Sequence, residues 1–446
     1  MAYKCYILGG GESGTGAAIL AKKQGLDVFL SDAGKIGDAH KQELLQYDIA
    51  FEEGKHTESK ILSADEIVKS PGIPEASLMV QKIREKGIPI ISELELAWRY
   101  KGDSRIIAIT GSNGKTTTTA LIYHICRHAN LDCALVGNIG YSIARQIALD
   151  PKALYVTEVS SFQLDDIHDF RADVAVLTNI TEDHLDRYNY QFEAYIKAKF
   201  KITTNQTSHD AFVYCADDPV SVQYISQHTI HSILFPITMN QEPQRGAFIN
   251  NGMMHIAVND EKIMMSVDDF KIKGRHNQYN TMAAGVTASV IGIRKEKIRE
   301  SISTFESLEH RMEQVAVVKG VTYVNDSKST NINSTWFALE SMKTDTILIL
   351  GGVDKGNDYK ILKSLVADKV RAIICLGTEN KKIHHAFKDL NISITDAESA
   401  MEAVSQAYKL AKNGDTVLLS PACASFDLFK NYEDRGNQFK AAVKLL

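Results

Sequence analysis

Short apolar segments recur along the chain, separated by glycine-containing turns and longer amphipathic stretches. At the amino end they predict, in order, a strand over residues 3–8, a glycine-rich turn over 9–16, a helix over 17–24 that Gly25 ends, and strands over 27–30, 66–69 and 88–91. Strands that alternate with helices are typical of a parallel sheet covered by helices. This part of the chain therefore predicts a doubly wound, Rossmann-like α/β domain.

A second series of alternating segments begins at Arg105. It predicts a strand over residues 106–109, a glycine-rich loop over 110–116, a helix over 117–130, and strands over 154–159 and 174–177. The segments over residues 209–268 are shorter and include the turn Asn250-Asn251-Gly252, so we expect this stretch to be β-rich and peripheral.

A third series begins near Leu308 and predicts strands over residues 322–324, 347–350, 372–376 and 416–419. Each strand is followed directly by Asn, Gly or Ser, and ligands of open α/β sheets bind at the carboxyl ends of the strands. A chain of 446 residues is too long for one hydrophobic core. We expect three domains, over residues 1–94, 95–306 and 307–446.

Composition narrows the class of protein. A net charge of −5 argues against a nucleic-acid binder, which usually carries a basic excess. The six cysteines contain no C-x-x-C pair, so neither a disulfide framework nor a zinc site is predicted and a reducing cytosol fits. No apolar run has the length of a membrane span, and the first one is too short for a signal peptide.

The first glycine turn fits the pattern G-x-G-x-x-G from Gly9 to Gly14. Asp32 ends the next strand, where dinucleotide-binding domains place an acid that binds ribose. Taken alone, this predicts NAD or FAD. The same turn also suits any nucleotide diphosphate, because backbone N–H groups and the helix dipole stabilise phosphate. A tight turn without a ligand is the third interpretation.

The second loop, T-G-S-N-G-K-T over residues 110–116, ends like a Walker A loop. A standard Walker A loop has glycine where this chain has Ile109, so the general pattern fails by one residue. Its mechanics are kept: Gly111 and Gly114 let the backbone curl around phosphates, Lys115 offsets their charge, and Thr116 can bind Mg²⁺. We therefore expect a P-loop-type ATPase domain with a mostly parallel sheet.

This loop resembles the ATP loop of the Mur ligases and the folylpolyglutamate synthases. Further segments resemble family motifs: residues 137–140 (GNIG), 158–164 (EVSSFQL), 178–186 (TNITEDHLD), Lys199 in YIKAK, His276-Asn277 with Asn280, and His310-Arg311. Residues 325–331 (NDSKSTN), 351–355 (GGVDK) and 420–427 (SPACASFD) resemble the D-glutamate-adding members. The D-N-P-R type motif of the members that add diaminopimelate or lysine is missing, Ser112 replaces a common Thr, and Phe426 replaces a common Leu.

The resemblance implies three domains: a Rossmann-like domain for the UDP-substrate, a central ATP-binding domain and a Rossmann-like C-terminal domain for the amino acid. It implies an enzyme that uses ATP to add D-glutamate to UDP-N-acetylmuramoyl-L-alanine through an acyl phosphate, in the bacterial cytoplasm, for peptidoglycan precursor synthesis. We expect a monomer that neither binds nucleic acid nor inserts into a membrane.

The family motifs also imply roles for individual residues. Catalysis is assigned to Lys115, Glu158, His184 and Lys199. ATP binding is assigned to Gly111, Ser112, Asn113, Gly114, Lys115, Thr116, Thr117, Asn277, Asn280, Arg311 and Asp326. The UDP-substrate is assigned to Ser13, Gly14, Thr15, Asp32, Gly72 and Asn138, and D-glutamate to Lys328, Thr330, Lys355, Ser425 and Phe426. Thr116, Glu158, His184 and a carbamylated Lys199 are expected to hold Mg²⁺.

Three alternatives stay open at this point. One is a related ligase with another substrate, such as a folylpolyglutamate synthase, although the segment Ser420 to Ser425 argues against it. The second is a nicotinamide-dependent oxidoreductase, which would leave Lys115, Glu158, His184 and Lys199 without roles. The third is a nucleotide-binding regulatory protein that has lost catalysis.

Overall fold

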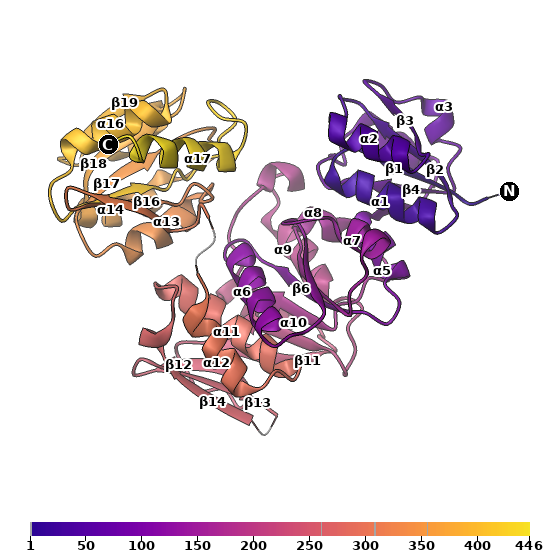
Figure 1. Ribbon diagram of the computed structural model, residues 1–446, viewed down its shortest axis with the longest axis horizontal. Coiled ribbons are helices and arrows are strands. Elements are labelled where there is room, and N and C mark those ends of the chain that lie inside the picture. Colours follow the sequence, from indigo (N-terminus) through magenta and orange to yellow (C-terminus); the bar gives the residue numbers. More distant parts are fainter. Residues whose placement is uncertain (1, 260, 307–308, 355) are drawn as a thin grey trace. The chain divides into compact units, whose positions relative to one another are not determined.

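The computed structural model describes residues 2–259, 261–306, 309–354 and 356–446. The chain divides into two compact units, one of Met1–Phe270 with Tyr279–Thr304 and one of Lys271–Gln278 with Phe305–Leu446. The first unit contains two β-sheets and the second contains one, and helices lie against each of them (Figure 1).

The amino-terminal sheet has five parallel strands in the order β3-β2-β1-β4-β5. The strands are β1 (Lys4–Leu8), β2 (Asp27–Asp32), β3 (Ala50–Glu53), β4 (Glu66–Lys69) and β5 (Ile90–Ser92), and the helices are α1 (Glu12–Lys23), α2 (Asp38–Gln46), α3 (Glu58–Ile61), α4 (Leu78–Glu85) and α5 (Glu93–Tyr100). Helix α1 begins at Glu12, so the glycine turn is shorter than predicted. Gly25 has a φ of 79° and ends the helix as expected.

The central sheet has nine strands in the order β14-β13-β12-β11-β10-β9-β6-β8-β7. The strands are β6 (Arg105–Thr110), β7 (Cys133–Gly137), β8 (Leu154–Glu158), β9 (Val174–Leu177), β10 (Ala211–Cys215), β11 (Ile233–Thr238), β12 (Gly246–Asn250), β13 (Met253–Val258) and β14 (Glu261–Ser266). The helices are α6 (Lys115–His128), α7 (Ile143–Leu149), α8 (Ser161–Asp165), α9 (Phe192–Phe200), α10 (Pro219–Gln227), α11 (Arg275–Val290) and α12 (Lys295–Thr304), with 3₁₀ turns η1 (Leu185–Tyr188), η2 (Lys201–Thr203) and η3 (Val267–Asp269).

Two predictions for this region need comment. Residues 209–268 are β-rich as predicted, and Asn251 and Gly252 make the hairpin turn between the antiparallel strands β12 and β13, both with positive φ. The same stretch also contains helix α10, which the sequence pattern did not predict. Asp218 caps α10 through a bond from Ser221 N–H, and Pro219 stands at its first position, where a missing N–H costs nothing.

The carboxyl-terminal sheet has the order β15-β16-β20-β17-β18-β19 and is parallel except for β15. The strands are β15 (Glu313–Val318), β16 (Val321–Asn325), β17 (Thr346–Leu350), β18 (Val370–Leu376), β19 (Ser393–Ala397) and β20 (Thr416–Leu419). The helices are α13 (Ile332–Ser341), α14 (Lys363–Lys369), α15 (Lys381–Phe387), α16 (Ala400–Leu410) and α17 (Tyr432–Val443), with the 3₁₀ turn η4 (Tyr359–Leu362).

Burial explains why the apolar runs form these strands. Strands β6, β8, β9, β17 and β20 are buried at almost every position, as expected for parallel strands covered on both faces. One apolar cluster joins β1, α1 and α5 to α7, β6 and β8, so the two sheets of the first unit share a continuous core. Two further clusters cover opposite faces of the carboxyl-terminal sheet.

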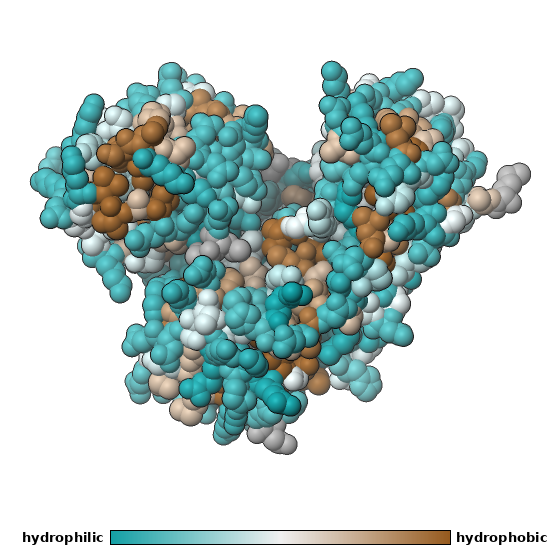
Figure 2. Space-filling model, viewed as in Figure 1, coloured by the Kyte–Doolittle hydropathy of each residue, from teal (hydrophilic) through white to brown (hydrophobic). Residues whose placement is uncertain are grey.

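Helices of the described residues are all too short or too polar to cross a membrane. The face shown in Figure 2 is mainly polar, with apolar residues gathered in separate patches.

Candidate active site

The glycine-rich loop after β6 has the geometry of a phosphate cradle. Gly111 has a φ of 143°, and a Cβ there would clash with Thr178 Oγ1. Gly114 adopts the left-handed conformation before α6, and a Cβ there would clash with Asn280 Oδ1. Both positions therefore require glycine. The N-terminus of α6 follows directly, so backbone N–H groups and the helix dipole favour an anion.

Lys115 lies over this loop, where its Nζ donates to the carbonyls of Gly111 at 2.8 Å and Ser112 at 3.0 Å. The loop is fixed from the other side by the chain after β9. Asn113 N–H donates to Asn179 Oδ1 at 3.0 Å, and Ser112 Oγ donates to Thr181 O at 2.8 Å. The loop is thus held in shape by protein contacts.

Glu158 ends β8 directly beside the loop, because Ile109 and Glu158 pair in the parallel register of β6 and β8. Its side chain is buried, with Oε1 accepting from Asn138 Nδ2 at 2.8 Å. Oε2 is buried and has no hydrogen-bond partner among the described residues. A buried carboxylate oxygen without a donor is expensive, and a cation would supply what it lacks. Thr116, also buried, is the second residue of α6, directly after the same loop.

Lys199 comes to the same place from α9 and is 1% exposed. Its Nζ donates to Gly111 O at 2.7 Å, on the carbonyl that Lys115 also contacts. Burial lowers the pKa of Lys199 well below its ordinary value, and the charge of Lys115 acts in the same direction. The acids Asp183, Glu158 and Asp165 oppose this effect without overcoming it.

The structure places His184 in a different environment from Glu158 and Lys199. Its side chain is 42% exposed, its φ is 53°, and its Nε2 lies 3.7 Å from Asp183 Oδ2. The imidazole ring packs against Phe162 with 5.3 Å between ring centroids. His184 thus stands on an exposed turn at the edge of the cluster.

Several residues of this cluster were not singled out from the sequence. Thr178 Oγ1 donates to Asn113 O at 2.6 Å, and Tyr195 OH lies 3.1 Å from Ser112 Oγ. Asp183 acts electrostatically on Lys199, and Arg187 lies over the Phe162 ring. Thr178 and Asp183 belong to the polar motif after β9, which was the available signal. Tyr195 offered no such signal, because a tyrosine on the apolar face of a helix is usually part of the hydrophobic core.

The first glycine turn is closed on itself. Gly10 N–H donates to Asp32 Oδ2 at 2.6 Å and Gly34 N–H donates to Asp32 Oδ1 at 2.7 Å, so the acid ties the turn to the chain after β2. A Cβ on Gly14 would clash with Gly9 O. Thr15 is fully buried, and Ser13 hydrogen-bonds the buried Glu93.

Gly72 lies in the loop after β4, at the same carboxyl edge of the sheet. Arg187 donates to the carbonyls of Pro71 at 3.1 Å and of Gly72 and Ile73 at 3.4 Å. The loop is therefore attached to the segment that carries His184.

The remaining nucleotide candidates divide between the two units. In the first unit, Asn280 Oδ1 accepts from Thr118 Oγ1 at 3.1 Å, next to the phosphate loop. In the second unit, Asn277 Nδ2 donates to Lys273 O. In the same unit, the positive charge of Arg311 acts to lower the pKa values of both His276 and Asp326. Burial raises the pKa of Asp326 to about 6, which Arg311 and bonds from Ser329 and Ser420 partly oppose.

The candidates for D-glutamate come from two segments that lie against each other. Ala422 N–H donates to Ser329 O at 3.0 Å, which brings the neighbours Lys328 and Thr330 to the segment that carries Ser425. Ser425 is buried, whereas Phe426 is 73% exposed. Lys355 lies outside the described residues. Arg435, not predicted from the sequence, is buried on α17 and holds both segments through Ser327 and Cys423.

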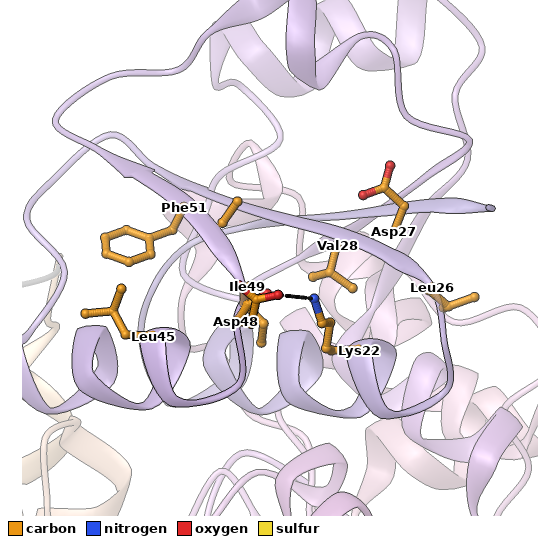
Figure 3. A pocket seen from close by; sticks show the side chains of 9 residues that line it. Lys22, Leu26, Asp27, Val28, Leu45, Asp48, Ile49 and Phe51 are labelled. Carbon is orange, nitrogen blue, oxygen red and sulfur yellow. Dashed lines mark hydrogen bonds and ion pairs between the residues drawn. The ribbon is translucent and has the colours of Figure 1, made fainter. Parts of the chain in front are cut away.

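A separate hollow lies on the amino-terminal sheet, between the starts of β2 and β3 and the ends of α1 and α2 (Figure 3). Lys22 and Asp48 form an ion pair across it, with Leu45 and Phe51 to one side. The hollow is at the amino ends of the strands, whereas the glycine turn and Asp32 are at the carboxyl ends. It therefore does not belong to the predicted nucleotide site.

Comparison with known proteins decides the family. Three family models match in succession: the MurD N-terminal domain over residues 4–79, the Mur ligase middle domain over 109–288, and the Mur ligase, glutamate ligase domain over 310–423. Proteins from Bacteroides fragilis and Porphyromonas gingivalis are each 52% identical over 443 residues, which is 99% of this chain and 99% and 98% of theirs. The chain belongs to the Mur ligase family. Both relatives are named UDP-N-acetylmuramoylalanine–D-glutamate ligase.

Solved structures of Mur ligases share the fold. The UDP-N-acetylmuramate-alanine ligase MurC of Thermotoga maritima has a TM-score of 0.62 at 18% identity, covering 99% of both chains. A pseudomurein peptide ligase type C of Methanothermus fervidus has a TM-score of 0.61 at 21% identity, covering 93% of this chain and 96% of that one. The predicted three-domain α/β fold and the resemblance to Mur ligases are both confirmed.

Proposed function

We propose that this Mur ligase joins D-glutamate to UDP-N-acetylmuramoyl-L-alanine and converts ATP to ADP and phosphate, as a step of peptidoglycan precursor synthesis. The observation that carries the proposal is similarity over 99% of the chain to ligases of that name. The phosphate cradle beside Glu158 and Lys199 supports the ATP-dependent half of the reaction.

The chemistry explains why such an enzyme needs ATP. A carboxylate oxygen of the UDP-substrate attacks the γ-phosphorus of ATP, and the bond to ADP breaks. The product is an acyl phosphate. The amine of D-glutamate then attacks the acyl carbon, phosphate leaves, and the amine proton passes to solvent. The protein's part is to orient the reactants and to stabilise the charge on the transferring phosphoryl group.

The phosphate loop supplies the first of these functions. Residues 111–117 would enclose the β- and γ-phosphates, and Lys115 would leave its loop carbonyls to contact them. Asn277, Asn280, Arg311 and Asp326 would bind the rest of the nucleotide. The phosphate loop lies between the end of β6 and the start of α6, where backbone N–H groups are available to anions.

Mg²⁺ fits the residues beside this loop. Oxygen ligands suit a hard cation, and the unpartnered Oε2 of Glu158 with the Thr116 hydroxyl offers them. Bound Mg²⁺ would offset phosphate charge. His184, on its exposed turn, would contribute to a second ion together with Lys199.

Lys199 would bind this second Mg²⁺ ion as a carbamate. An ammonium group cannot bind a cation, and in this buried place beside Lys115 the neutral amine is favoured. A neutral amine attacks the carbon of CO₂ and loses one proton, which gives an anionic carbamate with two oxygen ligands. The neighbouring Lys115 would stabilise that anion.

The other two substrates would also lie at the carboxyl ends of strands, each in its own sheet. Ser13, Gly14, Thr15, Asp32 and Gly72 would bind the UDP group, and Asn138 the muramoyl part. Lys328, Thr330, Ser425 and Phe426, with Lys355, would bind D-glutamate, whose two carboxylates call for cationic partners. The domain boundaries near residues 94 and 307, the monomeric state and the cytoplasmic location remain predictions.

Phosphate release from ATP tests the proposal. It should require the UDP-muramoyl-alanine substrate and D-glutamate together, with each omission lowering the rate to background. L-glutamate and diaminopimelate should support little release. Equal rates with either of these would remove the assigned specificity. Saturable micromolar binding of NADH would instead revive the oxidoreductase interpretation of the first glycine turn.

A further inference from the structure

Three side chains with metal-binding atoms meet in the second unit, outside the proposed active site. Cys375 is on β18, Asp396 on β19 and His384 on α15. Cys375 and Asp396 pair directly in the parallel register of their strands, so their side chains leave the sheet on the same face. Helix α15 covers that face, because Ile383 and Phe387 pack in the same apolar cluster as Cys375.

The ligand atoms are close enough for one ion. The sulfur, an imidazole nitrogen and a carboxylate oxygen all lie within 4.8 Å of one another, and His384 Nε2 is 3.1 Å from Asp396 Oδ1. Ligand atoms of a tetrahedral zinc site stand about 3.5 Å apart, given bond lengths of about 2.0–2.3 Å. A shift of about 1 Å in the side chains of His384 and Asp396 would close the site.

We propose that Cys375, His384 and Asp396 bind one transition-metal ion, of which Zn²⁺ fits best. A thiolate, an imidazole and a carboxylate together favour zinc over the hard cation Mg²⁺. Three protein ligands leave a fourth position for water or an added ligand. The site goes beyond the proposed ligase reaction, for which it supplies no group.

The surroundings of the three residues support this assignment. Asn380 Nδ2 donates to Asp396 Oδ1 at 2.8 Å, the kind of bond that orients a ligating carboxylate. Cys375 is fully buried and forms the floor, whereas His384 and Asp396 are partly exposed and leave an entry path.

The site also lies next to a loop assigned to D-glutamate. Lys382 on α15 forms an ion pair with Asp354 Oδ1 at 3.0 Å. Gly377, after β18, lies so close to Gly352 that a Cβ there would be 2.7 Å from the Gly352 nitrogen. A metal that fixes α15 to the sheet would therefore also steady the chain around Asp354.

Cobalt titration of the full chain tests the proposal. Metal-free protein, kept reduced and in excess Mg²⁺, is titrated with Co²⁺. We expect one Co²⁺ per chain with a thiolate-to-cobalt charge-transfer band in the near ultraviolet, which added Zn²⁺ abolishes. Only a cysteine ligand produces this band, so Co²⁺ bound at Glu158 or His184 does not mimic it.

Variants locate the ion. Cys375→Ser should lose the band, and His384→Ala or Asp396→Asn should weaken Co²⁺ binding at least tenfold. His385→Ala, the exposed neighbour on the same helix, should bind as the unmodified protein does. Absence of the band at millimolar Co²⁺ would overturn the proposal, and so would a band that persists in both His384→Ala and Asp396→Asn. These two variants alter partly exposed side chains, so they decide the matter even where Cys375→Ser fails to fold. Ligase activity need not change in either outcome.

Discussion

Lys199 is the residue whose surroundings and chemistry are hardest to reconcile without modification. Among the described residues, an ammonium group at this position would be buried beside Lys115, with the carbonyl of Gly111 as its hydrogen-bond acceptor and the Tyr195 ring 4.6 Å away. We expect Lys199→Ala to lower kcat at least 100-fold while the fold is kept, since the loss of a group that stabilises transferring phosphate costs about 3 kcal/mol or more in similar sites. Phosphate release measures the effect.

Lys197→Ala is the matched control, because Lys197 lies on the same helix two positions away and is exposed. It should keep nearly full activity. The carbamate itself is tested by removing dissolved CO₂, which should lower the activity of the unmodified enzyme, and by restoring bicarbonate. Full activity of Lys199→Ala would show that Glu158 and His184 hold the metal ions unaided.

The buried carboxyl group of Glu93 predicts how the folding stability of the protein depends on pH. Burial raises the pKa of its carboxyl to about 7 from the ordinary 4.5, the Glu12 charge adds to this, and a bond from Ala144 N–H opposes it. Because the folded pKa is raised, the unfolded chain releases the proton first as pH rises. The contribution of Glu93 to stability therefore falls between about pH 4.5 and pH 7 and is constant above.

Glu93→Gln keeps the acceptor for Ala144 and removes the titration. The free energy of unfolding of this variant, relative to that of the unmodified protein, should be higher at pH 8 than at pH 5. The difference should be on the order of 3 kcal/mol, given about 1.4 kcal/mol per pKa unit. Unfolding midpoints in urea at the two pH values measure it. The exposed Glu85→Gln should show no such difference. Parallel midpoints for Glu93→Gln and the unmodified protein would mean that Glu93 is not held protonated.

Among the elements, the loop between β6 and α6 depends most on a single backbone conformation. Gly114→Ala would combine a left-handed φ of 85° with a clash against Asn280, so we expect ATP binding to weaken at least tenfold. Gly25→Ala is the matched control: its φ is 79°, but a Cβ there would meet nothing within 4 Å. Titration with a fluorescent ATP analogue should be normal for Gly25→Ala. Equal affinities in both variants would show that the clash is relieved at no cost.

Among the strands, the sequence pattern predicted the buried central ones and missed four that stand at sheet edges. The apolar runs behind β1, β6, β8, β9, β17 and β20 were recognised because central parallel strands are buried on both faces. The four strands that no segment predicted, β3, β7, β15 and β19, all stand at a sheet edge. Strands β3 and β19 are partly exposed and lack a continuous apolar run. Strands β7 and β15 do contain one, over residues 133–136 and 315–318, and the sequence analysis did not recognise it.

The candidate site was predictable in part. The phosphate loop has a local signature, and the structure gives it the expected glycine conformations. The approach of Lys199 to Gly111 joins residues 88 positions apart, which periodicity cannot predict and only the family resemblance suggested. The same holds for Arg435, whose bonds to Ser327 and Cys423 depend on how α17 packs.

At the scale of the first unit, its two sheets are joined by polar contacts as well as by the shared core. Lys69 at the end of β4 pairs with the buried Asp166 after α8 at 3.0 Å, and Arg84 pairs with the same acid at 2.7 Å. A second group centres on Arg145 of α7. These contacts fix the glycine turn of the first sheet relative to Glu158 and Asn138 of the second.

Arg145 allows this coupling to be tested. Its guanidinium is buried, donates to both carboxylate oxygens of Glu12 at 2.7 and 2.9 Å, and also binds Glu43. Arg145→Ala would leave two partly exposed acids without their cation. Solvent screens them in part, so we expect a loss of about 1–3 kcal/mol and a midpoint of thermal unfolding lower by a few degrees. Because Glu12 begins the helix that carries Ser13 and Thr15, KM for the UDP-substrate should rise several-fold while kcat changes little.

Two further variants separate charge from geometry at this position. Arg145→Lys keeps the cation but not the planar guanidinium that matches the Glu12 carboxylate. It should therefore restore part of the stability lost in Arg145→Ala, while KM for the UDP-substrate stays raised. Arg127→Ala, on an exposed position of α6, should leave both quantities unchanged. A lower unfolding midpoint in Arg145→Ala with an unaltered KM would mean that the contact stabilises the unit but does not position the glycine turn. An unaltered midpoint would mean that the apolar core shared by α1, α5 and α7 holds the two sheets together without it.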